Sequence, residues 1–124
     1  MAVTPEGKIK KLVKAVLAKY NPRYEYWPVP GGYGASSLDC LVCYHGWFIA
    51  IETKAPGKKP TPRQELCIDE IKQAHGTVLV IDSEEGCREL ERRLEWIKNV
   101  ADNYQRQAQA DRGAGDGPNQ GPVP

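Results

Sequence analysis

Residues 38–54 have the sequence LDCLVCYHGWFIAIETK, in which two apolar runs are separated by the pair His45-Gly46. Runs of β-branched and aromatic residues on either side of a turn-forming pair predict a β-hairpin, with strands over 38–44 and 47–54. The turn also predicts the pairing, because strands that meet there align residues whose numbers sum to about 91. This hairpin is the most informative part of the chain.

The residues on either side of the hairpin predict three helices and two further strands. Thr4-Pro5 and Thr61-Pro62 each place an N-cap residue before a proline at the first helical position, and Gln64 completes a capping box with Thr61. The predicted elements are a helix from Pro5 to Asn21-Pro22, a strand over 24–29, a helix from Pro62 to about His75-Gly76, a strand over 77–81 and a helix from Glu84 to about Val100. The order α-β-β-β-α-β-α predicts an α/β fold.

The composition predicts one small domain followed by a tail. A chain of 124 residues with 40% hydrophobic residues holds one core of ordinary size. From Gln105 onward the chain has four Gly, three Pro and four Gln among twenty residues, which predicts disorder because little apolar surface is left to bury. We therefore expect a domain over 1–100 and a disordered tail over 101–124.

The net charge of +1 conceals two halves of opposite sign. Residues 1–63 hold ten Lys and Arg against four Asp and Glu, and residues 64–124 hold seven against twelve. A basic half is typical of a protein that binds nucleic acid or another phosphate-bearing partner.

The longest apolar run, Trp47–Ile51, is far shorter than the roughly 20 residues of a membrane helix. No unbroken apolar block follows the N-terminal lysines as in a secretory signal, so we expect a cytoplasmic protein with four reduced cysteines.

A cluster of ionisable residues is predicted at one end of the hairpin. Glu52 and Lys54 share a face of their strand, and the pairing places Asp39 opposite Glu52 and Thr53. Two close carboxylates repel unless a divalent cation lies between them, and oxygen ligands alone favour Mg²⁺ or Mn²⁺. A lysine beside them can orient or deprotonate an attacking water, which makes a site for phosphodiester hydrolysis. The alternative is a surface salt bridge between Glu52 and Lys54, with Asp39 as a loop cap.

Positive residues follow this cluster in the sequence. Lys58, Lys59 and Arg63 lie on a Gly/Pro loop that leads to the start of the second helix, which is a favourable surface for phosphate groups. The alternative is an ordinary solvated loop. Ahead of Asp39, a glycine cluster would either allow the backbone to approach a ligand closely or serve only a turn; its members are Gly31, Gly32 and Gly34.

Four segments of the chain resemble those of a known nuclease family. They are TPEGK at residues 4–8, GYGASSLD at 32–39, CYHGWFIAIETKAPGKKPTPRQ at 43–64 and AHG at 74–76. Their order and spacing resemble the virus-type replication-repair nuclease (VRR-NUC) family of the PD-(D/E)xK superfamily, especially its small stand-alone phage members. The resemblance covers residues 4 to about 82, and it departs from the family at Leu38, where the family has proline before the aspartate.

This resemblance implies a restriction-endonuclease-like α-β-β-β-α-β core with a central mixed sheet, to which this chain adds a C-terminal helix and the tail. By matching position, it implies that Asp39, Glu52 and Thr53 bind Mg²⁺ or Mn²⁺. It implies that Lys54 is the catalytic lysine and that Gln64 and Glu6 complete the site. From its charge, the loop with Lys58, Lys59 and Arg63 is expected to contact DNA. The expected substrate is branched DNA such as a Holliday junction, in phage DNA recombination, repair or replication in the host cytoplasm. Because two symmetric cuts need two active sites, we expect a homodimer.

Several of these residues have structural alternatives. Glu6 lies in the first turn of a helix, where the dipole favours any acid, and Gln64 can close its capping box onto Thr61. Cys40 and Cys43 form a C-x-x-C pair, but residues three apart on a strand face opposite ways and cannot chelate one ion. His45 is expected in the turn, and the three tryptophans in the core or an interface rather than under stacked bases; they are Trp27, Trp47 and Trp96.

The sequence therefore predicts a metal-dependent DNA endonuclease. A non-catalytic nucleic-acid-binding module with the same fold is the first alternative. The second is a structural or partner-binding protein that uses the acidic third helix as its contact face.

Overall fold

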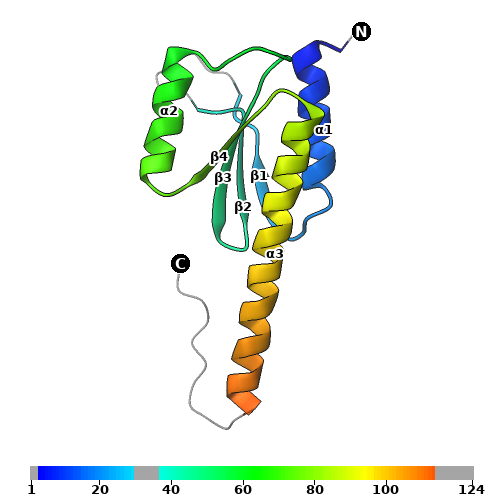
Figure 1. The fold of residues 1–124 in the computed structure, drawn as a ribbon, viewed down its shortest axis with the longest axis vertical. Coiled ribbons are helices and arrows are strands. Elements are labelled where there is room, and N and C mark those ends of the chain that lie inside the picture. Colours follow the sequence, from blue (N-terminus) through cyan, green and yellow to red (C-terminus); the bar gives the residue numbers. More distant parts are fainter. Residues whose placement is uncertain (1–2, 30–36, 114–124) are drawn as a thin grey trace.

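The computed structural model describes residues 3–29 and 37–113. The elements follow the predicted order α-β-β-β-α-β-α (Figure 1): α1 Pro5–Leu17, β1 Arg23–Tyr26, β2 Cys40–Tyr44, β3 Trp47–Thr53, α2 Pro62–Gln73, β4 Thr77–Ile81 and α3 Glu84–Gly113. Strand β1 is shorter than predicted, because Pro28 has no N–H to offer a neighbouring strand. The predicted loop glycines Gly31, Gly32 and Gly34 and the tail residues 114–124 lie outside the described residues.

The four strands form one mixed sheet in the order β1-β2-β3-β4. β1, β2 and β3 are antiparallel, and β4 runs parallel to β3. The hairpin pairs Cys40 with Ile51, so the predicted alignment of residues whose numbers sum to about 91 is confirmed. His45 and Gly46 have φ values of 49° and 83°, as a two-residue hairpin turn requires. An α/β fold with a mixed central sheet and an added C-terminal helix is therefore confirmed.

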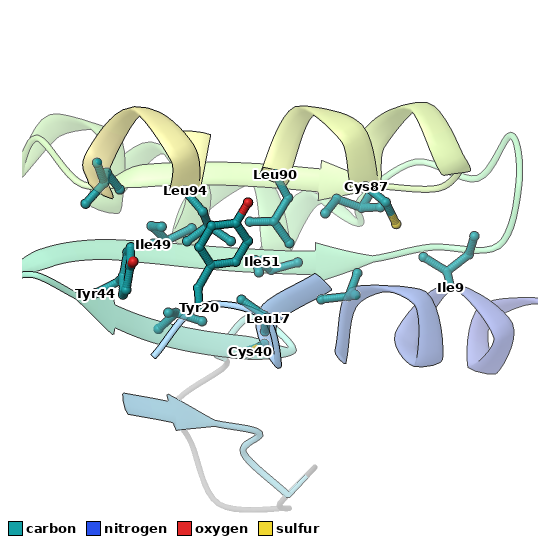
Figure 2. Close-up of a cluster of buried hydrophobic side chains, with 14 residues drawn as sticks. Ile9, Leu17, Tyr20, Cys40, Tyr44, Ile49, Ile51, Cys87, Leu90 and Leu94 are labelled. Atoms are coloured by element: carbon teal, nitrogen blue, oxygen red, sulfur yellow. The ribbon is translucent and has the colours of Figure 1, made fainter. Parts of the chain in front are cut away.

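Helices cover both faces of this sheet (Figure 1). α1 and α3 pack on one face, where Ile51 of β3 meets Leu17 and Leu90 in the main hydrophobic core (Figure 2). α2 packs on the other face, where Ala50 and Ile68 belong to a smaller core. Because both faces of β3 are covered, the polar side chains at its end, Glu52 and Thr53, are buried.

Helix α3 is longer than predicted. It continues to Gly113, so the helix end expected near Val100 and the disorder expected from 101 are wrong for residues 101–113. Residues 101–112 contain no Gly or Pro and are rich in Ala, Gln and Arg, which favour helix; averaging them with the Gly/Pro-rich end concealed this. Gln107 and Asp111, one turn apart, are joined by a hydrogen bond of 3.0 Å. This part of α3 extends beyond the sheet (Figure 1).

Within the described ranges, none of the helices combines the length and apolar character that crossing a membrane would demand.

Candidate active site

Asp39 and Thr53 connect the two strands of the hairpin at one end. The Oδ2 atom of Asp39 accepts hydrogen bonds from the backbone N–H of Thr53 at 2.9 Å and from its hydroxyl at 2.7 Å. The backbone N–H of Asp39 donates in turn to Oε1 of Glu52 at 3.2 Å. The prediction that Asp39 falls opposite Glu52 and Thr53 is confirmed, and the extra contacts hold both carboxylates in fixed positions.

Glu52 is a buried carboxylate with a lysine beside it. The residue is 1% exposed, and its Oε2 atom lies 3.4 Å from Nζ of Lys54. Burial raises the pKa of Glu52 above its usual value, and the charge of Asp39 raises it further, whereas Lys54 lowers it. Glu52 and Lys54 pair as in the salt-bridge alternative, but Glu52 is buried and Lys54 only partly exposed, so the pair is not a surface salt bridge. A buried carboxylate whose charge is only partly compensated is typical of a functional site.

Gln64 joins the first turn of α2 to this carboxylate. Its Nε2 atom donates a hydrogen bond of 2.7 Å to Oε2 of Glu52. Its Oε1 atom accepts from the backbone N–H of Thr61 at 2.9 Å, and its own N–H donates to the Thr61 hydroxyl at 3.2 Å, which completes the capping box. The amide of Gln64 therefore closes the capping box with its oxygen and contacts Glu52 with its nitrogen.

Glu6 is not brought into this cluster. Its carboxylate lies 4.0 Å from Nζ of Lys10, one turn along the same helix. In the part of the chain that the structure describes, no hydrogen bond or ion pair joins it to Asp39, Glu52 or Lys54. Its contacts are those of an acid at a helix N-terminus.

The basic loop between β3 and α2 is exposed, and an acid that was not predicted holds it. Lys58, Lys59 and Arg63 are all exposed. At Gly57 the backbone has φ +81°, and its N–H donates to Oδ2 of Asp82 at 3.3 Å. Asp82 directly follows β4, which runs parallel to β3. Because parallel neighbouring strands end at the same edge of a sheet, the place of Asp82 beside the β3–α2 loop could have been found from the predicted topology.

The cluster offers part of a donor set for a small divalent cation. Mg²⁺ prefers oxygen ligands and commonly binds through one or two carboxylates while keeping several waters. Among the described residues, Oδ1 of Asp39 accepts no hydrogen bond, so it is available to a cation. The same residues include no group of three or more His, Cys, Asp or Glu side chains that could hold a metal ion. A cation here would need Asp39, Glu52 and water; both Glu52 oxygens already accept hydrogen bonds, and the hydroxyl of Thr53, the third expected ligand, donates to Asp39.

Cysteine and tryptophan residues lie where the strand and helix patterns placed them. Cys40 is buried and Cys43 is exposed, so the two face opposite ways and do not form a metal site. Burial raises the pKa of the Cys40 thiol to about 12, which disfavours the thiolate that a metal would need. Trp27 packs against the main core, whereas Trp47 and Trp96 pack edge to face at 5.1 Å and stay partly exposed.

No protein-family model matches the chain. No curated protein matches its sequence either.

Proposed function

We propose that this protein is a metal-dependent endonuclease that hydrolyses phosphodiester bonds in DNA. The observation that carries the proposal is the cluster of Asp39 and Glu52 with Lys54 beside them, held at the ends of β2 and β3. Two carboxylates and a lysine on a rigid strand pair are a suitable donor set for hydrolysis of a phosphodiester. The motif resemblance to VRR-NUC nucleases points to the same chemistry.

A divalent cation at this site would stabilise the negative charge that develops on the phosphate and make water more acidic. Asp39 and Glu52 would hold the cation, and the amide of Gln64 keeps the Glu52 carboxylate in one orientation. Lys54, the ammonium partner of Glu52, is placed to orient the attacking water and to offset negative charge on the phosphate, while the proton of the water passes to solvent. Water adds to phosphorus as one P–O ester bond breaks, which leaves a phosphate monoester and a hydroxyl group.

The basic loop supplies the contact with DNA. Lys58, Lys59 and Arg63 are exposed and follow the cluster in the sequence, so a phosphate backbone bound by them would pass close to Lys54. Phosphate contacts of this kind position DNA without selecting a base sequence. We therefore propose selection by DNA structure, with branched DNA such as a Holliday junction as the substrate, in recombination, repair or replication of phage DNA.

The proposal is tested by cleavage of a labelled four-way junction and of supercoiled plasmid in Mg²⁺, in Mn²⁺ and in EDTA. Wild-type protein should cut with either cation and not in EDTA. Glu52→Gln and Lys54→Ala should lose cleavage. The matched controls Glu84→Gln and Lys98→Ala, at exposed residues, should keep it.

Two other results would point to the alternative functions. DNA binding that falls steeply with salt, without cleavage under any cation, would indicate a non-catalytic nucleic-acid-binding module. Weak binding with a flat salt response would indicate a partner-binding protein. In either case the nuclease proposal is wrong.

A further inference from the structure

The two edges of the sheet differ in how well they are protected from pairing. β1 forms one edge, and it has four residues, RYEY, that include the charged Arg23 and Glu25. β4 forms the other edge, and its sequence TVLVI contains no charge and no proline. Natural edge strands are usually protected by charges, prolines or bulges, because their unpaired backbone groups otherwise pair with another chain. β4 has the sequence of a central strand at the position of an edge strand.

The backbone of β4 shows which of its groups are free to pair. The carbonyl of Ile81 accepts a hydrogen bond of 2.9 Å from the N–H of Lys54, so Ile81 directs its backbone groups toward β3. Backbone direction alternates along a strand, so Leu79 also faces β3, whereas Val78 and Val80 direct their N–H and C=O groups outward. In the part of the chain that the structure describes, no strand pairs with this outer edge. Val80 is also 41% exposed, a large fraction for a valine in a strand.

We propose that β4 pairs with β4 of a second copy of this chain, antiparallel and about a two-fold axis at Leu79. In this register the outward groups of Val78 face those of Val80 in the partner, so the arrangement is self-complementary. The two four-stranded sheets would form one continuous sheet of eight strands. Because the argument uses only the strand edge, it does not depend on the proposed nuclease function.

The surface beside the edge also suits a second copy. A groove next to β4 is lined by Leu79 and by Glu89, Arg92, Arg93 and Trp96 of α3. Within this groove Glu89 and Arg92 already pair with each other at 2.6 Å, and Arg92 also pairs with Glu85. Arg93 lies 5.9 Å from the ring of Trp96 and has no carboxylate partner among the described residues, so it is free to pair across the axis.

This pairing would relate the two candidate active sites. Val80 is aligned with Glu52 on β3, so β4 would be the one strand between the candidate site and the β4 of the partner. With strands about 4.8 Å apart and a rise of about 3.4 Å per residue, the two Glu52 positions would be roughly 15 Å apart on one face of the joined sheet. A pair of sites on one face is the arrangement that two cuts in a branched substrate require.

The test is the mass of the full chain in solution, measured without DNA or metal by sedimentation equilibrium over a wide range of concentrations. Wild-type protein should have twice the 13.8 kDa mass of one chain. Val80→Pro removes an outward N–H but no hydrogen bond to β3, so it should raise the dimer dissociation constant on the order of 100-fold. Val80→Lys should act in the same direction through charge. Tyr24→Lys on the other edge strand, where the tyrosine is 65% exposed, should leave the dimer intact.

A circular dichroism melt of each variant separates loss of pairing from loss of folding. A Val80→Pro protein that stays folded and becomes monomeric supports the proposal, as does the same result for Val80→Lys if the proline variant unfolds. A wild-type protein that is monomeric at every concentration would overturn the proposal. Dimers that persist in both folded Val80 variants would overturn it as well.

Discussion

The side-chain amide of Gln64 donates a hydrogen bond of 2.7 Å to Oε2 of Glu52, and so ties the first turn of α2 to the end of β3. The bond crosses from one element to another, and it stabilises one orientation of a carboxylate that is almost fully buried. The capping box and the candidate active site therefore share a residue.

Gln64→Ala should raise the Mg²⁺ concentration needed for half-maximal cleavage by about 10-fold to 100-fold. This is the usual loss of metal affinity when a hydrogen-bond partner of a metal ligand is removed. The variant should also cost about 1 kcal/mol of stability, because the backbone N–H of Thr61 loses its acceptor in the capping box. Thr61→Ala removes the cap hydroxyl but leaves the amide on Glu52, so it should show the loss of stability with little change in Mg²⁺ dependence. Mg²⁺ titrations of the cleavage rate and thermal melts measure both effects. Equal Mg²⁺ dependence in the two variants would mean that Gln64 only caps α2.

Glu52→Gln should abolish cleavage and stabilise the fold at neutral pH. The pKa of Glu52 is raised in the folded state above its usual value of about 4.5 by burial and by Asp39. Its stabilising contribution is therefore complete below that usual value and is lost as the pH rises through the higher folded-state pKa. We expect a higher melting temperature at pH 7.5 in EDTA, with cleavage reduced by about 1000-fold or more. A lower melting temperature than wild type would contradict this account, and Glu84→Gln is the control.

Mg²⁺ should raise the melting temperature more at pH 8 than at pH 5. A cation needs the ionised form of Glu52, and the raised pKa moves that ionisation to a pH above the usual range. Ligand at about 100 times its dissociation constant would add about 2.7 kcal/mol of stability. Thermal melts with and without Mg²⁺ at the two pH values measure the effect without any DNA. The same increase at both values would mean that the cation binds elsewhere.

Replacing Lys58 and Lys59 together by alanine should weaken DNA binding most at low salt. If each lysine contacts one phosphate, the slope of log affinity against log salt should become less negative by about 1.8. Fluorescence anisotropy of a labelled junction over a range of salt concentrations measures this slope. The matched control replaces Lys98 and Arg106, on the part of α3 that extends beyond the sheet, and should leave the slope unchanged. An unchanged slope in the Lys58/Lys59 variant would remove the basic loop from the proposed interface.

The order of elements and the hairpin register could be predicted because local patterns specify them. A turn at His45-Gly46 fixes which residues pair, so the contact of Asp39 with Thr53 followed from counting along two strands. The burial of Glu52 could not be counted in this way, because it depends on α2 covering the second face of β3. The same tertiary contact gave Gln64 its second hydrogen bond.

The errors have physical reasons of the same kind. The end of α3 was missed because residues 101–112 favour helix locally, while the composition was averaged over a longer stretch. Glu6 has helical spacing toward the core, yet Lys10 lies one turn away and pairs with it. The place of β4 at an edge of the sheet could not be predicted, because an apolar run does not reveal whether one or two strands flank it.

The far end of α3 offers a place to hold the molecule. Residues 98–113 add about 24 Å of helix beyond the core, at 1.5 Å per residue, and lie at the opposite end from the β3–α2 loop (Figure 1). A dye or a surface linker attached at Gly113 would be separated from Asp39 and Glu52 by this length. Single molecules could then be immobilised through α3 and observed on DNA with the candidate active site left uncovered.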